Sequence, residues 1–202
     1  MSKQLYLASQ SPRRLELLRQ IGLAPIVLTL RHDPARADVD ETPLIGEKAW
    51  DYVTRLARLK AQAALRAVAG RRLMPRPIVA ADTTVTLDGE ILGKPRDAAE
   101  AGAWLRRYSG RSHTVLTAVA VAHQDQLRVA VSESTVRFGP LDEQDIAHYL
   151  ASGEPFDKAG GYGVQGRAAA FVEHLAGSYS GVMGLPLYET VELLKSVGFD
   201  AR

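Results

Sequence analysis

The sequence predicts an α/β protein built on a mixed β-sheet with flanking helices. Short apolar segments typical of strands alternate with amphipathic helical segments near both ends of the chain, as in parallel α/β units. Two hairpin signals lie between them, at Asp88-Gly89 and at Gln124-Asp125-Gln126, each flanked by strand-like segments. Because hairpins join antiparallel strands, parallel and antiparallel pairing must occur in the same sheet.

The first predicted strand and helix enclose a polar turn with two arginines. Residues 5–8 form an apolar run typical of a strand, and apolar residues at helical spacing follow the turn. Ser11 is the expected N-cap, and Pro12 suits the first helical position, where no backbone N–H is lost. Arg13 and Arg14 then lie beside free amides at the positive end of the helix dipole, which together favour a phosphate. The alternative is an ordinary helix start with two solvated arginines.

An acidic stretch separates the next strand from a long helix. Residues 25–30 predict the strand, and residues 47–69 carry the apolar stripe of an amphipathic helix. The stretch 31–46 is too irregular for a strand and contains Asp40 and Glu41. Hard divalent cations bind carboxylate oxygens and leave room for substrate phosphates, so this pair indicates a cation site. The alternative is a solvated acidic loop.

A carboxylate follows the most apolar segment of the chain. Residues 78–81 are typical of a strand buried on both faces, and we expect this strand to end at Asp82. A side chain at such an end faces the crevice in which open α/β sheets bind ligands. The alternative is a turn or cap residue, but Thr83-Thr84 continues a strand and no helix needs a cap there. Asp82 is therefore a candidate functional residue.

The second half of the chain continues the alternation of helices and strands. The expected segments are the Gly93-Lys94-Pro95 turn, a helix begun by a capping box of Asp97 and Glu100, strands over 113–123 and 127–138, a helix begun by Asp142 and Asp145, a glycine-rich loop over 158–166, a strand over 169–175 and a last helix after Pro186. Lys94 in the turn and Lys60 near the edge of the long helix's apolar stripe are candidates for phosphate binding, and the alternative for each is a solvated lysine.

The glycine-rich loop matches G-x-G-x-x-G over residues 161–166, but its context excludes a dinucleotide-binding motif. That motif needs a preceding strand and a helix that opens within it, whereas here a turn precedes and a strand-like run follows. We expect the glycines to let the backbone pass close to a flat ligand. Gln165 could then face the imide edge of uracil or thymine, because one amide both donates and accepts. The alternative for Gln165 is loop packing.

The composition indicates one globular domain over residues 1–202 and excludes several other classes. The chain has 46% hydrophobic and 24% charged residues, no cysteine and a net charge of +2. Disulfides, thiolate metal sites and a broad basic surface for duplex DNA are therefore not expected. No apolar run approaches the roughly 20 residues that cross a bilayer, and we expect no secretory signal. We expect a cytoplasmic protein with neither a membrane nor a nucleic-acid partner.

Taken together, these stretches give the sequence a resemblance to the Maf family of nucleoside triphosphate pyrophosphatases along nearly its whole length. The resemblance lies in several motifs that occur in the family's order: Leu7 to Arg14, Asp40-Glu41, Leu56 to Ala61, Ala81-Asp82-Thr83, Gly93-Lys94-Pro95, Lys158 to Gly166, and Gly177-Ser178-Tyr179 with Gly184-Leu185-Pro186. The resemblance implies an elongated fold with two lobes around a central cleft, related to the inosine triphosphate pyrophosphatases and often a homodimer.

The same resemblance implies site residues and a reaction. It implies that Asp82 is the general base, that a Mg²⁺ or Mn²⁺ ion binds at Glu41 and Asp82, and that phosphates bind at Ser9, Arg13, Arg14, Lys60 and Lys94. It also implies hydrolysis of dTTP and UTP to the monophosphate and pyrophosphate, with base choice governed by Arg13, Thr83 and Gln165. The stretch 31–46 matches the family poorly apart from Asp40-Glu41. Two alternatives remain: a non-catalytic nucleotide-binding regulator of cell division, and a pyrophosphatase for modified nucleotides.

Overall fold

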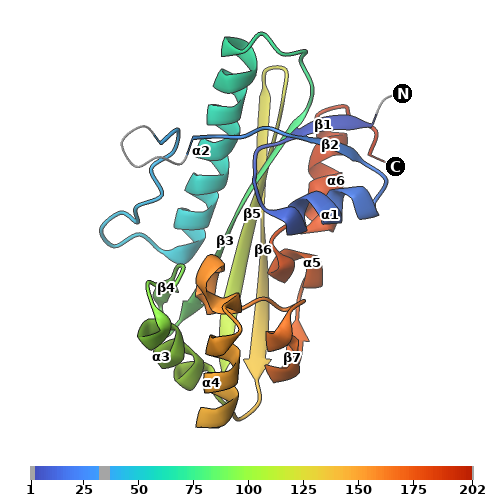
Figure 1. The fold of residues 1–202 in the computed structure, drawn as a ribbon. Coiled ribbons are helices and arrows are strands. Elements are labelled where there is room, and N and C mark those ends of the chain that lie inside the picture. Colours follow the sequence, from blue (N-terminus) through green and yellow to red (C-terminus); the bar gives the residue numbers. More distant parts are fainter. Residues whose placement is uncertain (1–2, 32–36, 202) are drawn as a thin grey trace.

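The computed structural model describes residues 3–31 and 37–201 and shows an elongated α/β protein (Figure 1). A 7-stranded sheet has the order β2-β1-β3-β5-β6-β7, with β4 paired to β3. The elements are β1 (Gln4–Leu7), α1 (Pro12–Gln20), β2 (Ala24–Val27), α2 (Ala49–Gly70), β3 (Ile78–Leu87), β4 (Glu90–Leu92), α3 (Ala98–Tyr108), β5 (Ser112–His123), β6 (Gln126–Phe138), α4 (Glu143–Ala151), η1 (Glu154–Asp157), η2 (Ala159–Gly161), η3 (Arg167–Phe171), β7 (Val172–Ala176), α5 (Tyr179–Met183) and α6 (Leu187–Ser196).

The sheet is mixed, which confirms the predicted fold class. Strand β1 pairs in parallel with β2 and β3, whereas β3, β5, β6 and β7 pair antiparallel. The long strands β5 and β6 run along most of the molecule, with β1, β2, α1, α2 and α6 at one end and α3, α4 and β7 at the other (Figure 1). The two hairpins that the sequence predicts join β3 to β4 and β5 to β6.

Strand β3 corrects one expectation about Asp82. The sequence predicts that this strand ends at Asp82, but the strand continues to Leu87 and pairs with β5 from Ile78 to Thr86. The other edge of β3 is paired with β1 only as far as Val79 and with β4 only from Val85. Asp82 therefore lies inside the strand, in a stretch where one edge has no paired strand among the described residues.

Small side chains allow helix α2 to pack closely on one face of the sheet. One core cluster joins α2 to β3 and β5 through alanines, among them Ala57, Ala61, Ala64, Ala80, Ala118 and Ala120. Helices α1 and α6 pack on the opposite face against leucines and valines of β1, β3 and β5. Because side chains alternate along a strand, neighbouring residues of β3 face different layers. Asp82 faces α2, while Thr83 faces the layer that contains α1.

The predicted helices begin at or near the expected residues, but not all of the predicted capping hydrogen bonds are present. Ser11 precedes α1 as expected, but its side chain makes no capping hydrogen bond. Asp97 accepts from the Glu100 amide, while the Glu100 carboxylate accepts from the Arg96 amide instead of completing a capping box. Helix α4 has the full reciprocal box. Such local patterns fix where a helix begins, but neighbouring groups compete for each bond.

The remaining differences are local. Strand β7 begins at Val172 rather than Ala169, because the 3-10 helix η3 occupies residues 167–171. The short helix α5 was not predicted. Part of the predicted acidic stretch, residues 32–36, lies outside the described residues. Across the described ranges, none of the helices has the length and apolar composition needed to cross a membrane.

A buried histidine gives a testable pH dependence of stability. His113 lies among Tyr108, Phe138 and Tyr162, and its Nε2 is 2.7 Å from the Tyr162 hydroxyl. Burial lowers the pKa of His113 from 6.5 to about 4. As the pH falls, His113 is protonated in the unfolded chain before it is protonated in the folded protein. The free energy of unfolding should therefore decrease by about 3 kcal/mol between pH 7 and pH 4 because of this group. Urea unfolding of the wild type and of His113→Gln across this pH range measures this decrease, which the variant should lack. An equal dependence of the unfolding free energy on pH in both proteins would contradict the role given to His113.

Candidate active site

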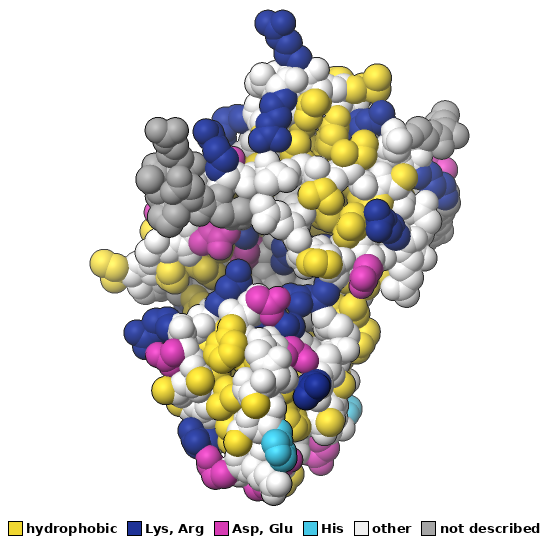
Figure 2. Space-filling model, in the orientation of Figure 1, with side chains coloured by type: hydrophobic (Ala, Val, Ile, Leu, Met, Phe, Trp, Pro, Cys, Tyr) yellow, Lys and Arg dark blue, Asp and Glu magenta, His cyan; other side chains and the backbone are white. Residues whose placement is uncertain are grey.

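A large cleft crosses the middle of the molecule. Its volume is about 1260 Å³. Figure 2 shows this face hollowed at mid-height, with basic and acidic side chains gathered around the hollow. The polar turn before α1, residues 37–42 and α2 line one side, and Lys94, the 157–165 segment and the end of α5 line the other. The cleft contains every site residue expected from the sequence: Ser9, Arg13, Arg14, Glu41, Lys60, Asp82, Thr83, Lys94 and Gln165.

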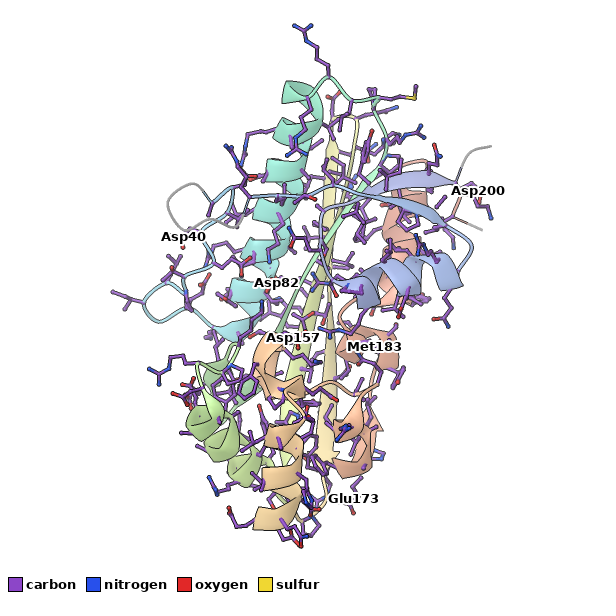
Figure 3. The ribbon with its side chains drawn as sticks, in the orientation of Figure 1. Asp40, Asp82, Asp157, Glu173, Met183 and Asp200 are labelled. Carbon is purple, nitrogen blue, oxygen red and sulfur yellow. The ribbon has the colours of Figure 1, made fainter. Side chains whose placement is uncertain are left out.

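Asp82 and Lys60 form a buried ion pair on the cleft floor. The Lys60 ammonium lies 2.7 Å from Oδ1 of Asp82, and the two side chains are 12% and 11% exposed. The same ammonium lies 2.8 Å from Oε1 of Glu41, whose side chain is 48% exposed. Asp82 lies on β3 beside α2 in Figure 3. One lysine from α2 thus connects two carboxylates that are 41 residues apart in sequence, and all three side chains line the cleft.

The environment of Asp82 favours a basic carboxylate. Burial raises the pKa of Asp82 above its ordinary value, whereas the charges of Lys60 and Arg14 oppose this rise. Desolvation disfavours the charged form of a carboxyl group, so an ionised Asp82 gains more from accepting a proton than a solvated aspartate does. Perturbed carboxyl groups in clefts are typical of catalytic sites.

Arg14 is held almost entirely by protein acceptors. Its Nε donates to the Gly184 carbonyl at 2.7 Å and its Nη1 to the Ala81 carbonyl at 2.8 Å. Nη1 also donates to Ser9 Oγ, and Nη2 to Thr83 Oγ1, both at 3.2 Å. A guanidinium has five N–H donors, so at most one remains for a phosphate oxygen. Arg14 therefore fixes the segments around Asp82, and it contributes mainly its positive charge to the cleft that it lines.

The bond to Ala81 shows why β3 needs this arginine. The β1 ladder ends with the Ala8 amide, which donates to the Val79 carbonyl. Arg14 supplies the next donor along the same edge of β3, at the Ala81 carbonyl. An unpaired buried carbonyl would cost about 1–3 kcal/mol, so the guanidinium stabilises the point at which the sheet opens into the cleft.

Two cationic side chains lack such partners. Arg13 and Lys94 make no hydrogen bond or ion pair within residues 3–31 and 37–201, and both line the cleft. Ser9 Oγ accepts from the Ser11 amide and from Arg14, which leaves its own proton to donate. Thr83 Oγ1 lies 3.0 Å from Thr117 Oγ1, so its hydroxyl also participates in the protein's own network.

Side chains of α2 hold the acidic segment over the cleft. The Tyr52 hydroxyl donates to the Glu41 carbonyl at 3.0 Å, and Arg55 donates to the Thr42 carbonyl at 3.1 Å. Glu47 accepts from Arg55 at 2.6 Å, and this contact lowers the pKa of Glu47 to about 2. Tyr52 is not among the site residues that the sequence predicts. Its position two helical turns before Lys60 was the available signal, because residues eight apart share a helix face.

The glycine-rich loop is built differently from the expectation. Its glycines were expected to admit a ligand, but a Cβ at Gly166 would lie 2.2 Å from Oε1 of Glu154, and one at Gly163 would lie 2.9 Å from Cε of Lys158. These two glycines therefore make room for side chains of the protein itself. Gln165, between them, is exposed and lines the cleft, as expected.

The carboxylates at the cleft suit a cation that is shared with a substrate. The described ranges contain no group of three or more His, Asp or Glu side chains arranged to hold a metal ion. Glu41 and Asp82 nevertheless converge on one ammonium and offer hard oxygen donors. Mg²⁺ commonly binds through one or two carboxylates together with waters and substrate phosphates, so these two residues fit that mode.

Comparisons with known proteins found similar sequences over nearly the whole chain. A family model described as "Maf-like protein" matches residues 4–197. A protein of Dechloromonas aromatica (strain RCB) named dTTP/UTP pyrophosphatase is 56% identical over 197 residues, which are 96% of this chain and 98% of that protein. One of the same name from Ralstonia nicotianae (strain ATCC BAA-1114 / GMI1000) is 60% identical over 191 residues, 94% of this chain and 92% of that protein. The solved structure of the Staphylococcus aureus Ham1 protein is 18% identical, with a TM-score of 0.46 over 67% of this chain and 71% of that chain.

Proposed function

This chain belongs to the Maf family, and we propose that it is a nucleoside triphosphate pyrophosphatase that hydrolyses dTTP and UTP to the monophosphate and pyrophosphate. The names of its relatives support the substrates. The observation that carries the chemistry is the buried Asp82 carboxylate in a cleft lined by Arg13, Arg14, Lys60 and Lys94. A triphosphate needs several cations, and a hydrolase needs a base beside them.

In the proposed reaction, a water oxygen bonds to the α-phosphorus as the bond to the bridging oxygen breaks. Asp82 accepts a proton from this water, a role worth about 100- to 10,000-fold in rate. Lys60, Lys94 and Arg13 neutralise the charge that develops on the departing pyrophosphate. Glu41 and Asp82 are the residues that would hold a divalent cation, which supplies further charge neutralisation at the phosphates.

We assign base recognition chiefly to Gln165, in the 157–165 segment that lines the cleft. Gln165 is exposed there, and its amide matches the donor and acceptor pattern of a uracil or thymine imide. Arg13 is available to contribute, since it makes no hydrogen bond or ion pair within the described ranges. Thr83 is the weakest of the three specificity candidates. Its hydroxyl is already hydrogen-bonded within the protein, 3.2 Å from Nη2 of Arg14 and 3.0 Å from Oγ1 of Thr117.

A product panel tests the proposed function. Purified protein is incubated with each ribo- and deoxyribonucleoside triphosphate in Mg²⁺ or Mn²⁺, and pyrophosphate and orthophosphate are measured separately. We expect pyrophosphate from dTTP and UTP without orthophosphate. Binding of dTTP without pyrophosphate release would favour the nucleotide-binding regulator, and faster turnover of a modified nucleotide would favour the modified-nucleotide pyrophosphatase.

A further inference from the structure

Glu154 lies behind the loop that carries Gln165, outside the lining of the cleft. It is the first residue of η1, and its carboxylate points beneath the turn formed by residues 163–166. Its Oε2 accepts from the Arg167 amide at 2.9 Å, and its Oε1 accepts from the Tyr149 hydroxyl at 3.2 Å. The carboxylate thereby ties the end of the turn to helix α4.

The turn itself is closed over this carboxylate. The Gly166 amide donates to the Gly163 carbonyl at 2.9 Å, and Gln165 lies inside the closed turn. A Cβ at Gly166 would lie 2.2 to 2.6 Å from three atoms of the Glu154 carboxyl group, closer than any side chain tolerates. The absence of a side chain at Gly166 is therefore what lets Glu154 reach the Arg167 amide.

A second contact holds the start of the same loop. The Lys158 ammonium donates to the Glu154 carbonyl at 2.8 Å, and its Cδ and Cε lie against Gly163. Glu154 thus meets both ends of the loop, through its backbone at one end and its carboxylate at the other. Glu154 therefore constrains the backbone around Gln165 from both ends, although it does not itself line the cleft.

We propose that Glu154 is a positioning residue for base recognition, which fixes the turn so that the Gln165 amide meets the pyrimidine imide edge. This inference rests on the proposed function for the identity of the substrate. An amide that recognises a base must be held in a fixed direction, because hydrogen bonds weaken steeply when they are misaligned. Loss of Glu154 should therefore reduce discrimination between bases more than it reduces phosphate chemistry.

The test compares two pyrimidines that differ at the recognised edge. dTTP has an imide, whereas dCTP has an acceptor nitrogen and an amine at the same positions. The measured quantity is the ratio of kcat/KM for dTTP to that for dCTP. We expect Glu154→Ala to lower this ratio about tenfold, the effect of one neutral hydrogen bond, and Gln165→Ala to lower it by a similar factor. The ratio of the double variant should be no lower than that of either single variant. Glu154→Gln keeps an acceptor for the Arg167 amide, so it should retain most of the wild-type ratio.

Gly166→Ala provides an independent arm that leaves Glu154 in the chain. The added methyl group should displace the carboxylate and lower the ratio as Glu154→Ala does. In the Glu154→Ala background, where the space is open, Gly166→Ala should have little further effect. The proposal would be overturned if Glu154→Ala lowered kcat/KM equally for both nucleotides. It would also be overturned if the reductions of the ratio in the two single variants multiplied in the Glu154 and Gln165 double variant.

A binding measurement separates this proposal from the proposed function. Calorimetric titration with non-hydrolysable α,β-imido analogues of dTTP and dCTP measures the same discrimination as a ratio of two dissociation constants. If the wild type binds the dTTP analogue but releases no pyrophosphate from dTTP, the proposed function fails, and the binding ratio still decides the role of Glu154. An unchanged binding ratio in Glu154→Ala would refute that role whatever the activity.

Discussion

Replacement of Asp82 by asparagine is expected to lower kcat for dTTP about 100- to 10,000-fold while the nucleotide still binds. Asparagine has nearly the shape of aspartate, and its amide oxygen can accept from Lys60 as Oδ1 of Asp82 does at 2.7 Å. It cannot take a proton from water at neutral pH. Single-turnover rates and the dissociation constant of a non-hydrolysable dTTP analogue separate the chemical step from binding.

Asp40→Asn is the matched control for this experiment. Asp40 also lines the cleft, but its carboxylate accepts from the Thr42 amide at 2.9 Å, and no contact with Lys60 is found for it in the described part of the chain. Its removal changes the net charge of the cleft by the same amount as Asp82→Asn. We expect kcat to change less than tenfold. Near-normal turnover by Asp82→Asn would remove this residue from the chemistry, and equal losses in both variants would reduce its role to general charge.

The parts of the site that the sequence predicts are those set by local pattern. The apolar stripe of α2 puts Lys60 near the edge of the face toward the sheet, and the Ser-Pro-Arg-Arg turn puts two arginines at a helix start. The strand pattern of residues 78–81 identifies Asp82 as a carboxylate that faces the crevice, and the structure shows that it is buried. The predicted strand end at Asp82 was wrong although Thr83-Thr84 also indicated a strand, because pairing with β5 carries β3 through this polar residue.

The partners of Arg14 illustrate the same limit. A motif supplies the charge, but the acceptors that fix the guanidinium lie 67 to 170 residues away in the sequence at Ala81, Thr83 and Gly184. The glycine-rich loop is a second case. Its glycines signal a close approach, and only the fold shows that the approaching groups are Glu154 and Lys158. Sequence pattern thus predicts which residues matter more readily than what each of them contacts.

Replacement of Lys60 by methionine is expected to have opposite effects on turnover and on cation binding. Loss of one well-placed donor to the phosphates should lower kcat/KM for dTTP about 100- to 1000-fold. In the structure, however, the ammonium lies within 2.8 Å of both Glu41 and Asp82, the two carboxylates that would hold a divalent cation. Methionine removes this positive charge, so Mn²⁺ added alone should bind more tightly to the variant.

Electron paramagnetic resonance of free Mn²⁺ measures that affinity without any turnover. Lys158→Met is the control, because Lys158 lines the same cleft but its ammonium contacts Asp157 and the Glu154 carbonyl. This control should leave Mn²⁺ affinity unchanged. Unchanged or weaker Mn²⁺ binding in Lys60→Met would contradict the competition. If Lys60 and the cation do compete for the two carboxylates, a triphosphate that draws Lys60 toward its own oxygens must raise the affinity for the cation. By linkage, the cation must then raise the affinity for the nucleotide by the same factor.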